Sequence, residues 1–181
     1  MILFFGPTGS GKSMQGQILA ARQGWRWLSA GQILRDSKNP ILLQTMQSGE
    51  LIDSNTMNKI ISSAISNSAE IEKIVLDGFP RKLDQAKWLI ESQPEHGRSV
   101  GMVIVLDVSE EEIEKRLRLR GRVDDNASTL TEKMKIYYQE IDPLLNYFRE
   151  QNIRVVHIDG SGLVGQIHDR IMEELVKCNL A

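Results

Sequence analysis

The sequence predicts an α/β protein in three layers, with helices on both faces of a five-stranded parallel sheet. Five short apolar runs alternate with longer segments of helical periodicity, which is the pattern of parallel strands joined by crossover helices. Each run is followed by a small or acidic residue, as expected where a strand ends in a loop. The 181 residues fit one domain. The predicted strands are residues 2–5, 25–28, 74–76, 102–106 and 155–158.

The first apolar run leads directly into a glycine-rich loop. Residues 6–13 read GPTGSGKS, which satisfies the phosphate-loop pattern GxxxxGK[ST] at every fixed position. The glycines allow a tight loop whose backbone N–H groups point at phosphate oxygens, and the helix that follows adds its partial positive end. Lys12 supplies a mobile positive charge, and the Ser13 hydroxyl can ligate magnesium. The loop predicts binding of a nucleoside triphosphate.

Helical patterns follow the first two strands. The first helix is expected over residues 13–23. Residues 31–67 are polar and lack a strand pattern, with breaks near residues 39–40 (Asn-Pro) and 48–49 (Ser-Gly). We therefore expect several short helices there, forming an insert after the second strand.

Three helices are expected in the second half of the chain. Ser109 and Glu112 form a capping-box pattern for a helix that runs to about Arg120. The last helix is expected over residues 164–177, with Ile167, Ile171 and Leu175 facing inward. A longer helix from Asn126 carries large side chains at steps of three or four: Leu130, Met134, Tyr137, Ile141, Leu144 and Phe148. We interpret the aromatic ones as core rather than binding-site residues.

The composition excludes several classes of protein. The 22 basic and 24 acidic side chains give a net charge of −2, so there is no overall attraction to nucleic acid or to an anionic membrane. Cys178 is the single cysteine, which rules out a disulfide within the chain and suits a reducing compartment. No apolar run approaches the ~18 residues of a membrane helix, and no signal peptide is apparent. We expect a cytoplasmic protein.

A phosphate loop alone is compatible with kinases, GTPases, ATPases and transporters, and three further stretches narrow the choice. Residues 29–35 read SAGQILR, residues 76–81 read LDGFPR with Gln85 four positions beyond, and residues 120–126 read RGRVDDN. Asp77 ends the third predicted strand, which we expect beside the first, so its carboxylate would lie near the phosphate loop and can orient magnesium or its waters. With these motifs the chain resembles the adenylate kinase family of nucleoside monophosphate kinases, nearly from end to end.

The resemblance implies an architecture. The fold would be of the phosphate-loop kinase type, with a single nucleoside monophosphate kinase domain over residues 1–181. A helical insert at about 29–67 would bind the nucleoside monophosphate. A short lid segment would lie at about 120–126.

The resemblance also implies roles for individual residues on the donor side. Mg²⁺ would be held by Ser13 and Asp77. ATP would be bound by Gly6, Gly9, Ser10, Gly11, Lys12, Ser13, Met14, Arg116, Arg120 and Gly162. Among these, the resemblance implies that Gly162 contacts the donor adenine through its backbone. The charges that stabilise the transferring phosphoryl group would come from Lys12, Arg81, Arg116, Arg120, Arg122 and Lys133.

A second set of residues is implied for the acceptor, AMP. Ala30 stands where adenylate kinases typically have threonine. An alanine at this position is more similar to the uridylate/cytidylate kinases, whereas a glutamine at the position of Gln85 is typical of adenine-accepting members. We give Gln85 more weight, because its amide can pair with a base edge and alanine offers no polar contact. The full acceptor set is Ala30, Gly31, Arg35, Leu51, Ile52, Gly78, Arg81, Gln85, Arg122 and Lys133.

The sequence departs from the family in three further places. Ser13 and Met14 follow Lys12 where the family usually has Gly-Thr, and Lys133 replaces an arginine, which removes a planar fork of donors. Asp124 and Asp125 are expected to orient the phosphate-binding cations rather than act as bases. Only residues 120–121 precede Arg122, so the lid is minimal.

These features predict reversible, Mg²⁺-dependent, direct in-line transfer of a phosphoryl group, ATP + AMP = 2 ADP. No histidine or cysteine falls in a motif, so no covalent phosphoenzyme is expected. The alternatives are a UMP/CMP kinase, or an ATPase or assembly factor on the same fold. We expect nucleotides as the partners of a monomer that contacts neither nucleic acid nor membrane.

Overall fold

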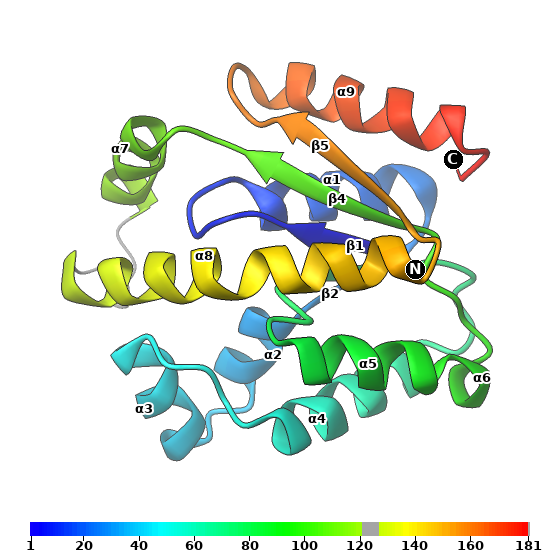
Figure 1. Ribbon diagram of the computed structural model, residues 1–181, viewed down its shortest axis with the longest axis horizontal. Helices are drawn as coiled ribbons and strands as arrows, with labels where there is room; N and C mark the ends of the chain where they lie inside the picture. The colour runs from blue at the N-terminus through cyan, green and yellow to red at the C-terminus, as the bar shows by residue number, and fades with distance from the viewer. Residues whose placement is uncertain (121–126, 181) are drawn as a thin grey trace.

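The sheet is the centre of the molecule (Figure 1). The structure is a computed structural model that describes residues 1–120 and 127–180. Within these residues one five-stranded, all-parallel sheet has the strand order β2-β3-β1-β4-β5. Its strands are β1 (Ile2–Phe5), β2 (Arg26–Ser29), β3 (Ile74–Asp77), β4 (Met102–Asp107) and β5 (Arg154–Asp159).

Burial follows the position of each strand in the sheet. β1 and β3 are buried throughout, and β4 is buried except at its last residue, because helices cover both faces of a parallel sheet. Successive residues of β1 point to opposite faces: Leu3 and Phe5 enter one apolar cluster, and Ile2 and Phe4 enter the other. The edge strands β2 and β5 mix exposed and buried residues.

Helices cover both faces, as the sequence predicts. Helices α1 and α9 pack on one face, and α4, α5 and α8 contribute to the core on the other. The described helices are α1 (Lys12–Gln23), α2 (Ala30–Asp36), α3 (Pro40–Ser48), α4 (Ser54–Ser66), α5 (Leu83–Glu91), α6 (Gln93–His96), α7 (Glu110–Arg120), α8 (Ala127–Glu150) and α9 (Val164–Lys177).

The polar stretch after β2 folds into short helices with the predicted breaks. Asn39 caps α3, accepting hydrogen bonds from the backbone N–H groups of Ile41 and Leu42, and Pro40 occupies its first turn. Gly49 ends this helix with φ 85°, a conformation that glycine adopts without strain. Asp53 then caps α4 through the N–H of Thr56.

Two long helices in the second half also agree with the prediction. The inward positions of α9, Ile167, Ile171 and Leu175, are buried. In α8, which continues through Pro143, Leu144 and Phe148 are buried against the sheet. Among residues 1–120 and 127–180, no helix combines the length and the apolar character needed to cross a membrane.

Candidate nucleotide-binding site

A cavity of about 760 Å³ opens at the carboxyl edge of the sheet. This edge is where ligands bind in open α/β sheets, because the loops that follow neighbouring strands meet there. The phosphate loop after β1 and the residues that end β3 form its centre, and α2, α7, α8 and the start of α9 form its walls. The cavity therefore joins segments that lie far apart in the sequence.

The phosphate loop is shaped by glycines with positive φ. Gly6 has φ 139°, and a Cβ there would lie 2.8 Å from the carbonyl oxygen of Leu106 and 2.7 Å from Ser10 Oγ. No side chain caps the first turn of α1, whose N-cap is Gly11. The N–H groups of this turn thus have no side-chain acceptor and lie at the positive end of the helix, which is the arrangement that binds phosphate.

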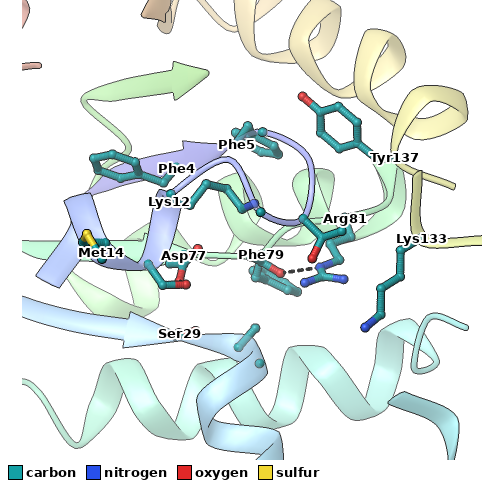
Figure 2. Close-up of a pocket in the computed structure, with 18 of the residues that line it drawn as sticks. Phe4, Phe5, Lys12, Met14, Ser29, Asp77, Phe79, Arg81, Lys133 and Tyr137 are labelled. Atoms are coloured by element: carbon teal, nitrogen blue, oxygen red, sulfur yellow. Dashed lines mark hydrogen bonds between the residues drawn. The ribbon is translucent and has the colours of Figure 1, made fainter. Parts of the chain in front are cut away.

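Lys12 is held inside the loop. Its Nζ donates to the carbonyl oxygen of Pro7 at 2.7 Å and to Ser10 Oγ at 3.4 Å. Burial is the main reason that the pKa of the Lys12 ammonium is lowered to about 8; the charges of Arg81 and Arg120 contribute to this shift, and Asp77 partly opposes it. Figure 2 shows Lys12 between Asp77 and Arg81. More basic than acidic side chains line the cavity, which suits an anionic ligand.

Ser13 and Asp77 form a pair of oxygen donors beside Lys12. Ser13 Oγ donates to Asp77 Oδ2 at 2.6 Å, and Asp77 is 2% exposed at the end of β3. The parallel register sets Asp77 opposite Phe4 of β1 and Ser29 of β2. Strand pairing therefore fixes this carboxylate next to the phosphate loop, as the sequence predicts.

The arginines of α7 face the phosphate loop. Arg116 Nη1 donates to the carbonyl oxygen of Ser10 at 3.2 Å, and its Nη2 donates to that of Gly160 at 2.9 Å. Arg120 Nη2 contacts Thr8 Oγ1 at 3.4 Å. Both side chains thus reach the cavity, which agrees with a donor-side role better than with simple complementation of the helix dipole.

The predicted capping box at the start of α7 forms only in part. The N–H of Glu112 donates to Ser109 Oγ at 3.4 Å. The Glu112 carboxylate instead accepts from Arg116 Nε at 2.8 Å, with the two side chains 34% and 23% exposed. This ion pair orients Arg116, so Glu112 supports the site rather than only the helix end.

The acceptor-side residues gather around the segment after β3. Gln85 is 2% exposed, and its Oε1 accepts from the backbone N–H of Arg81 at 2.8 Å. Arg81 Nε donates to the carbonyl oxygen of Gly78 at 2.9 Å. In α2, Arg35 Nη2 donates to Gln32 Oε1 at 3.1 Å. These bonds hold Arg81 and Gln85 in one rigid unit at the edge of the cavity.

The structure brings nearly all of the predicted site residues together. Ser10 is fully buried and accepts a bond from Lys12 instead of lining the cavity. Arg122, Asp124 and Asp125 lie outside the described residues. The predicted residues that line the cavity are Gly6, Gly9, Gly11, Lys12, Ser13, Met14, Ala30, Gly31, Arg35, Leu51, Ile52, Asp77, Gly78, Arg81, Gln85, Arg116, Arg120, Lys133 and Gly162.

One face of α8 also lines the cavity, and sequence reasoning identified only Lys133 on this face. Tyr137 was expected in the core alone; it packs against the core and lines the cavity as well. Burial and the nearby Asp107 carboxylate raise the pKa of its phenol. Ile136 and Glu140 lie on the same face. Helical periodicity identifies this face correctly, but it does not distinguish a core contact from a cavity wall.

The fold and the site together define a phosphate-loop nucleotide-binding protein, in which Arg35, Arg81 and Gln85 line the same cavity as the loop. The adenylate kinase family model matches residues 4–153. An adenylate kinase of Mycobacterium tuberculosis is 31% identical over 182 residues, covering 97% of this chain and 99% of the relative. The adenylate kinase of Thermus thermophilus is 31% identical over 184 residues, covering 96% of each chain.

The chain belongs to the adenylate kinase family. It is a nucleoside monophosphate kinase, a phosphotransferase that binds ATP. This confirms the family and the three-layer α/β fold that the motifs predict.

Proposed function

We propose that the protein catalyses ATP + AMP = 2 ADP, with ATP on the phosphate loop and AMP beside Arg81 and Gln85. The observation that carries the proposal is that residues predicted to bind ATP and residues predicted to bind AMP line the same cavity. An ATPase does not require Arg35, Arg81 and Gln85, whereas a kinase of this class needs an acceptor site opposite the donor. The names of the relatives support AMP as the acceptor.

The hydrogen bonding of Gln85 is compatible with an adenine acceptor. Its Oε1 already accepts from the Arg81 N–H, so the amide NH₂ is the group that can address a base. Adenine offers a ring-nitrogen acceptor for that NH₂. Ala30 lines the cavity without a polar group, so base recognition depends on Gln85.

The mechanism follows from the charge distribution. Phosphoryl transfer needs two nucleotides held in line and positive groups around the moving phosphoryl group. We expect these positive groups to be Lys12, Arg81, Arg116, Arg120 and Lys133, which all line the cavity. Transfer is direct, since an acceptor phosphate held by Arg81 removes the need for a covalent enzyme intermediate.

The donor pair of Ser13 and Asp77 fits Mg²⁺. Hard cations prefer hydroxyl and carboxylate oxygens, and these two oxygens lie 2.6 Å apart beside Lys12. Bound with ATP, Mg²⁺ neutralises phosphate charge and helps to align the transferring group. Ser13 and Asp77 would hold it while Lys12 contacts the outer phosphates.

We further infer that α2, α3 and α4 form the acceptor-binding insert within a single domain over residues 1–181. α3 has no fully buried residue and packs against the core through the half-buried Leu42 and Met46. Movement of this insert toward the phosphate loop would exclude water, together with the short lid at residues 120–126. We expect the protein to act as a monomer, because both half-sites belong to one chain.

An acceptor panel tests the proposal. AMP, UMP, CMP and GMP are each offered with ATP and Mg²⁺, and formation of nucleoside diphosphate is measured. We expect AMP to be the fastest acceptor by at least about tenfold, since loss of a matched polar contact to a base costs about that factor or more. Equal or faster turnover of UMP or CMP would refute AMP as the acceptor.

The Arg81→Ala variant tests the kinase assignment itself. We expect a fall in kcat of about 10²-fold or more, because Arg81 provides charge-assisted hydrogen bonds to a phosphate in the transition state. Arg149→Ala removes an exposed arginine that contacts Asn146 far from the cavity, and serves as the control. Unchanged turnover in Arg81→Ala would rule out the proposed kinase mechanism.

A further inference from the structure

The loop between β5 and α9, residues 160–163, is fixed by side chains from its own surroundings. Arg170 Nη1 donates to the carbonyl oxygens of Asp159 and Ser161, at 2.7 and 2.8 Å. Gln166 Oε1 accepts from the N–H of Leu163 at 3.0 Å. Gly162, with φ 97°, lines the cavity in the middle of this loop. The backbone of this loop is thus pre-ordered where it faces the proposed donor site.

One further bond ties the end of this loop to the phosphate-binding helix. Gln15 Nε2 donates to the carbonyl oxygen of Val164 at 2.9 Å, across 149 residues of sequence. Gln15 lies one turn after Lys12 in α1 and is 2% exposed, and both Gln15 and Val164 line the cavity. The bond therefore connects the site of the triphosphate to the wall formed by the β5–α9 loop.

The oxygen of the same amide argues against a packing role for Gln15. Its Oε1 is buried and has no hydrogen-bond partner among the described residues. Buried amide oxygens are rarely left without a partner, and an apolar side chain of the same size would fill this space without that penalty. An amide is therefore favoured at this position only if its N–H group has a function. That N–H group donates to the carbonyl oxygen of Val164.

We propose that Gln15 is a positioning residue for the base of ATP. By holding Val164 against α1, it sets the separation between the phosphate loop and the backbone around Gly162. A base at Gly162 and a triphosphate at Lys12 then fit the cavity together. The inference rests on the proposed donor site, and it is independent of which monophosphate is the acceptor.

The test compares a ligand that has a base with one that has none. Gln15→Met keeps the length and apolar volume of the side chain but removes the donor. Gln23→Met is the matched control, because Gln23 also lies in α1 and contacts α9 through Met172 Sδ at 3.8 Å, outside the cavity. Dissociation constants for ATP, GTP and inorganic tripolyphosphate are measured by calorimetry without any acceptor.

We expect Gln15→Met to weaken ATP binding by about 5- to 10-fold, the effect of one lost hydrogen bond. The dissociation constant of tripolyphosphate should change by less than about twofold. The ratio of the dissociation constants of GTP and ATP should become smaller. The value of kcat at saturating ATP should be preserved. Gln23→Met should bind all three ligands like the unaltered protein. Gln15→Leu also removes the donor and adds no charge, so it should show the same selective loss, and it provides a second variant if Gln15→Met folds poorly.

Two results would overturn the inference. Equal weakening of ATP and tripolyphosphate would mean that Gln15 acts through the phosphate loop. Unchanged ATP affinity in both variants would mean that the bond to Val164 has no influence on the donor base. Failure of the proposed function would appear elsewhere, in the acceptor panel, because these binding measurements contain no acceptor.

Discussion

The pKa of Lys12 in the ligand-free protein is set by its surroundings in the phosphate loop. Its ammonium is buried among the backbone of the phosphate loop and shares the cavity with Arg81 and Arg120. The resulting pKa of about 8 is well below the usual value of 10.5. A bound triphosphate would supply negative charge to this site and restore the charged form of Lys12.

The lowered pKa of Lys12 predicts that the affinity for ATP depends on pH. Below about pH 7.5 Lys12 is already charged, so the dissociation constant of ATP should be nearly flat. As the pH rises through 8, the free protein loses the proton that the complex retains, and binding should weaken by up to about tenfold per pH unit. Calorimetry in buffers of different ionisation enthalpy would detect the proton taken up on binding.

Lys12→Met is the control for this measurement. The variant should bind ATP weakly, and its affinity should not vary between pH 7.5 and 9.5. An affinity of the unaltered protein that stays constant over the same range would show that Lys12 does not lose its proton near pH 8.

At the scale of elements, the packing of α9 on α1 and the sheet includes one polar side chain. His168 is 2% exposed between apolar neighbours of α9, and neither ring nitrogen has a hydrogen-bond partner in the described part of the chain. Burial lowers the pKa of the His168 imidazole, the charge of Arg22 on α1 lowers it further, and Asp169 opposes the shift. The helix therefore packs best when this ring is neutral.

The position of His168 predicts a loss of stability in acid. Because its native pKa lies below the ordinary value of 6.5, the unfolded chain binds a proton below about pH 6.5 that the native protein does not. The free energy of unfolding should thus fall as the pH drops from 7 towards 5, by at most about 1.4 kcal/mol per pH unit from this residue. Denaturant titrations at several pH values measure this dependence.

His168→Leu should flatten that dependence, because it removes the group that titrates. His157→Gln is the comparison, since His157 is exposed and pairs with Asp107 at the surface. If His168→Leu loses stability with acid as steeply as the unaltered protein, other groups are responsible.

At the scale of the whole molecule, the cavity combines two half-sites with a very short connection between α7 and α8. α7 ends at Arg120 and α8 begins at Ala127, so six residues connect them. Longer lids would cover more of a bound triphosphate. A short segment at this place predicts incomplete exclusion of water from the transferring phosphoryl group.

The consequence should be a slow hydrolysis of ATP in the absence of AMP. Purified protein with ATP and Mg²⁺ should release phosphate at a measurable rate, and addition of AMP should redirect the phosphoryl group to ADP. The Arg81→Ala variant should retain more of this hydrolysis than of the kinase activity. The reason is that the charge of Arg81, which the variant lacks, belongs to the proposed acceptor site. No phosphate release above that of a Lys12→Met sample would contradict the prediction.

The sequence by itself determined the five strands, the phosphate loop, the family and the helices other than α5 and α6, which were not predicted. These features are encoded locally: a strand is recognised by a short apolar run, α3 by Asn39 and Gly49 at its ends, and the loop by residues 6–13. The sequence also predicted that Asp77 lies beside the loop, because carboxyl ends of parallel strands share one edge.

Only the tertiary structure decided how the side chains of the site are held. The bond from Gln15 to Val164, the two bonds from Arg116 to backbone carbonyls, and the exposure of Tyr137 to the cavity each depend on segments distant in sequence. The pKa of Lys12 likewise depends on burial and on charges from other elements. Hydrogen bonds act over about 3 Å, and no local pattern specifies which distant groups come that close.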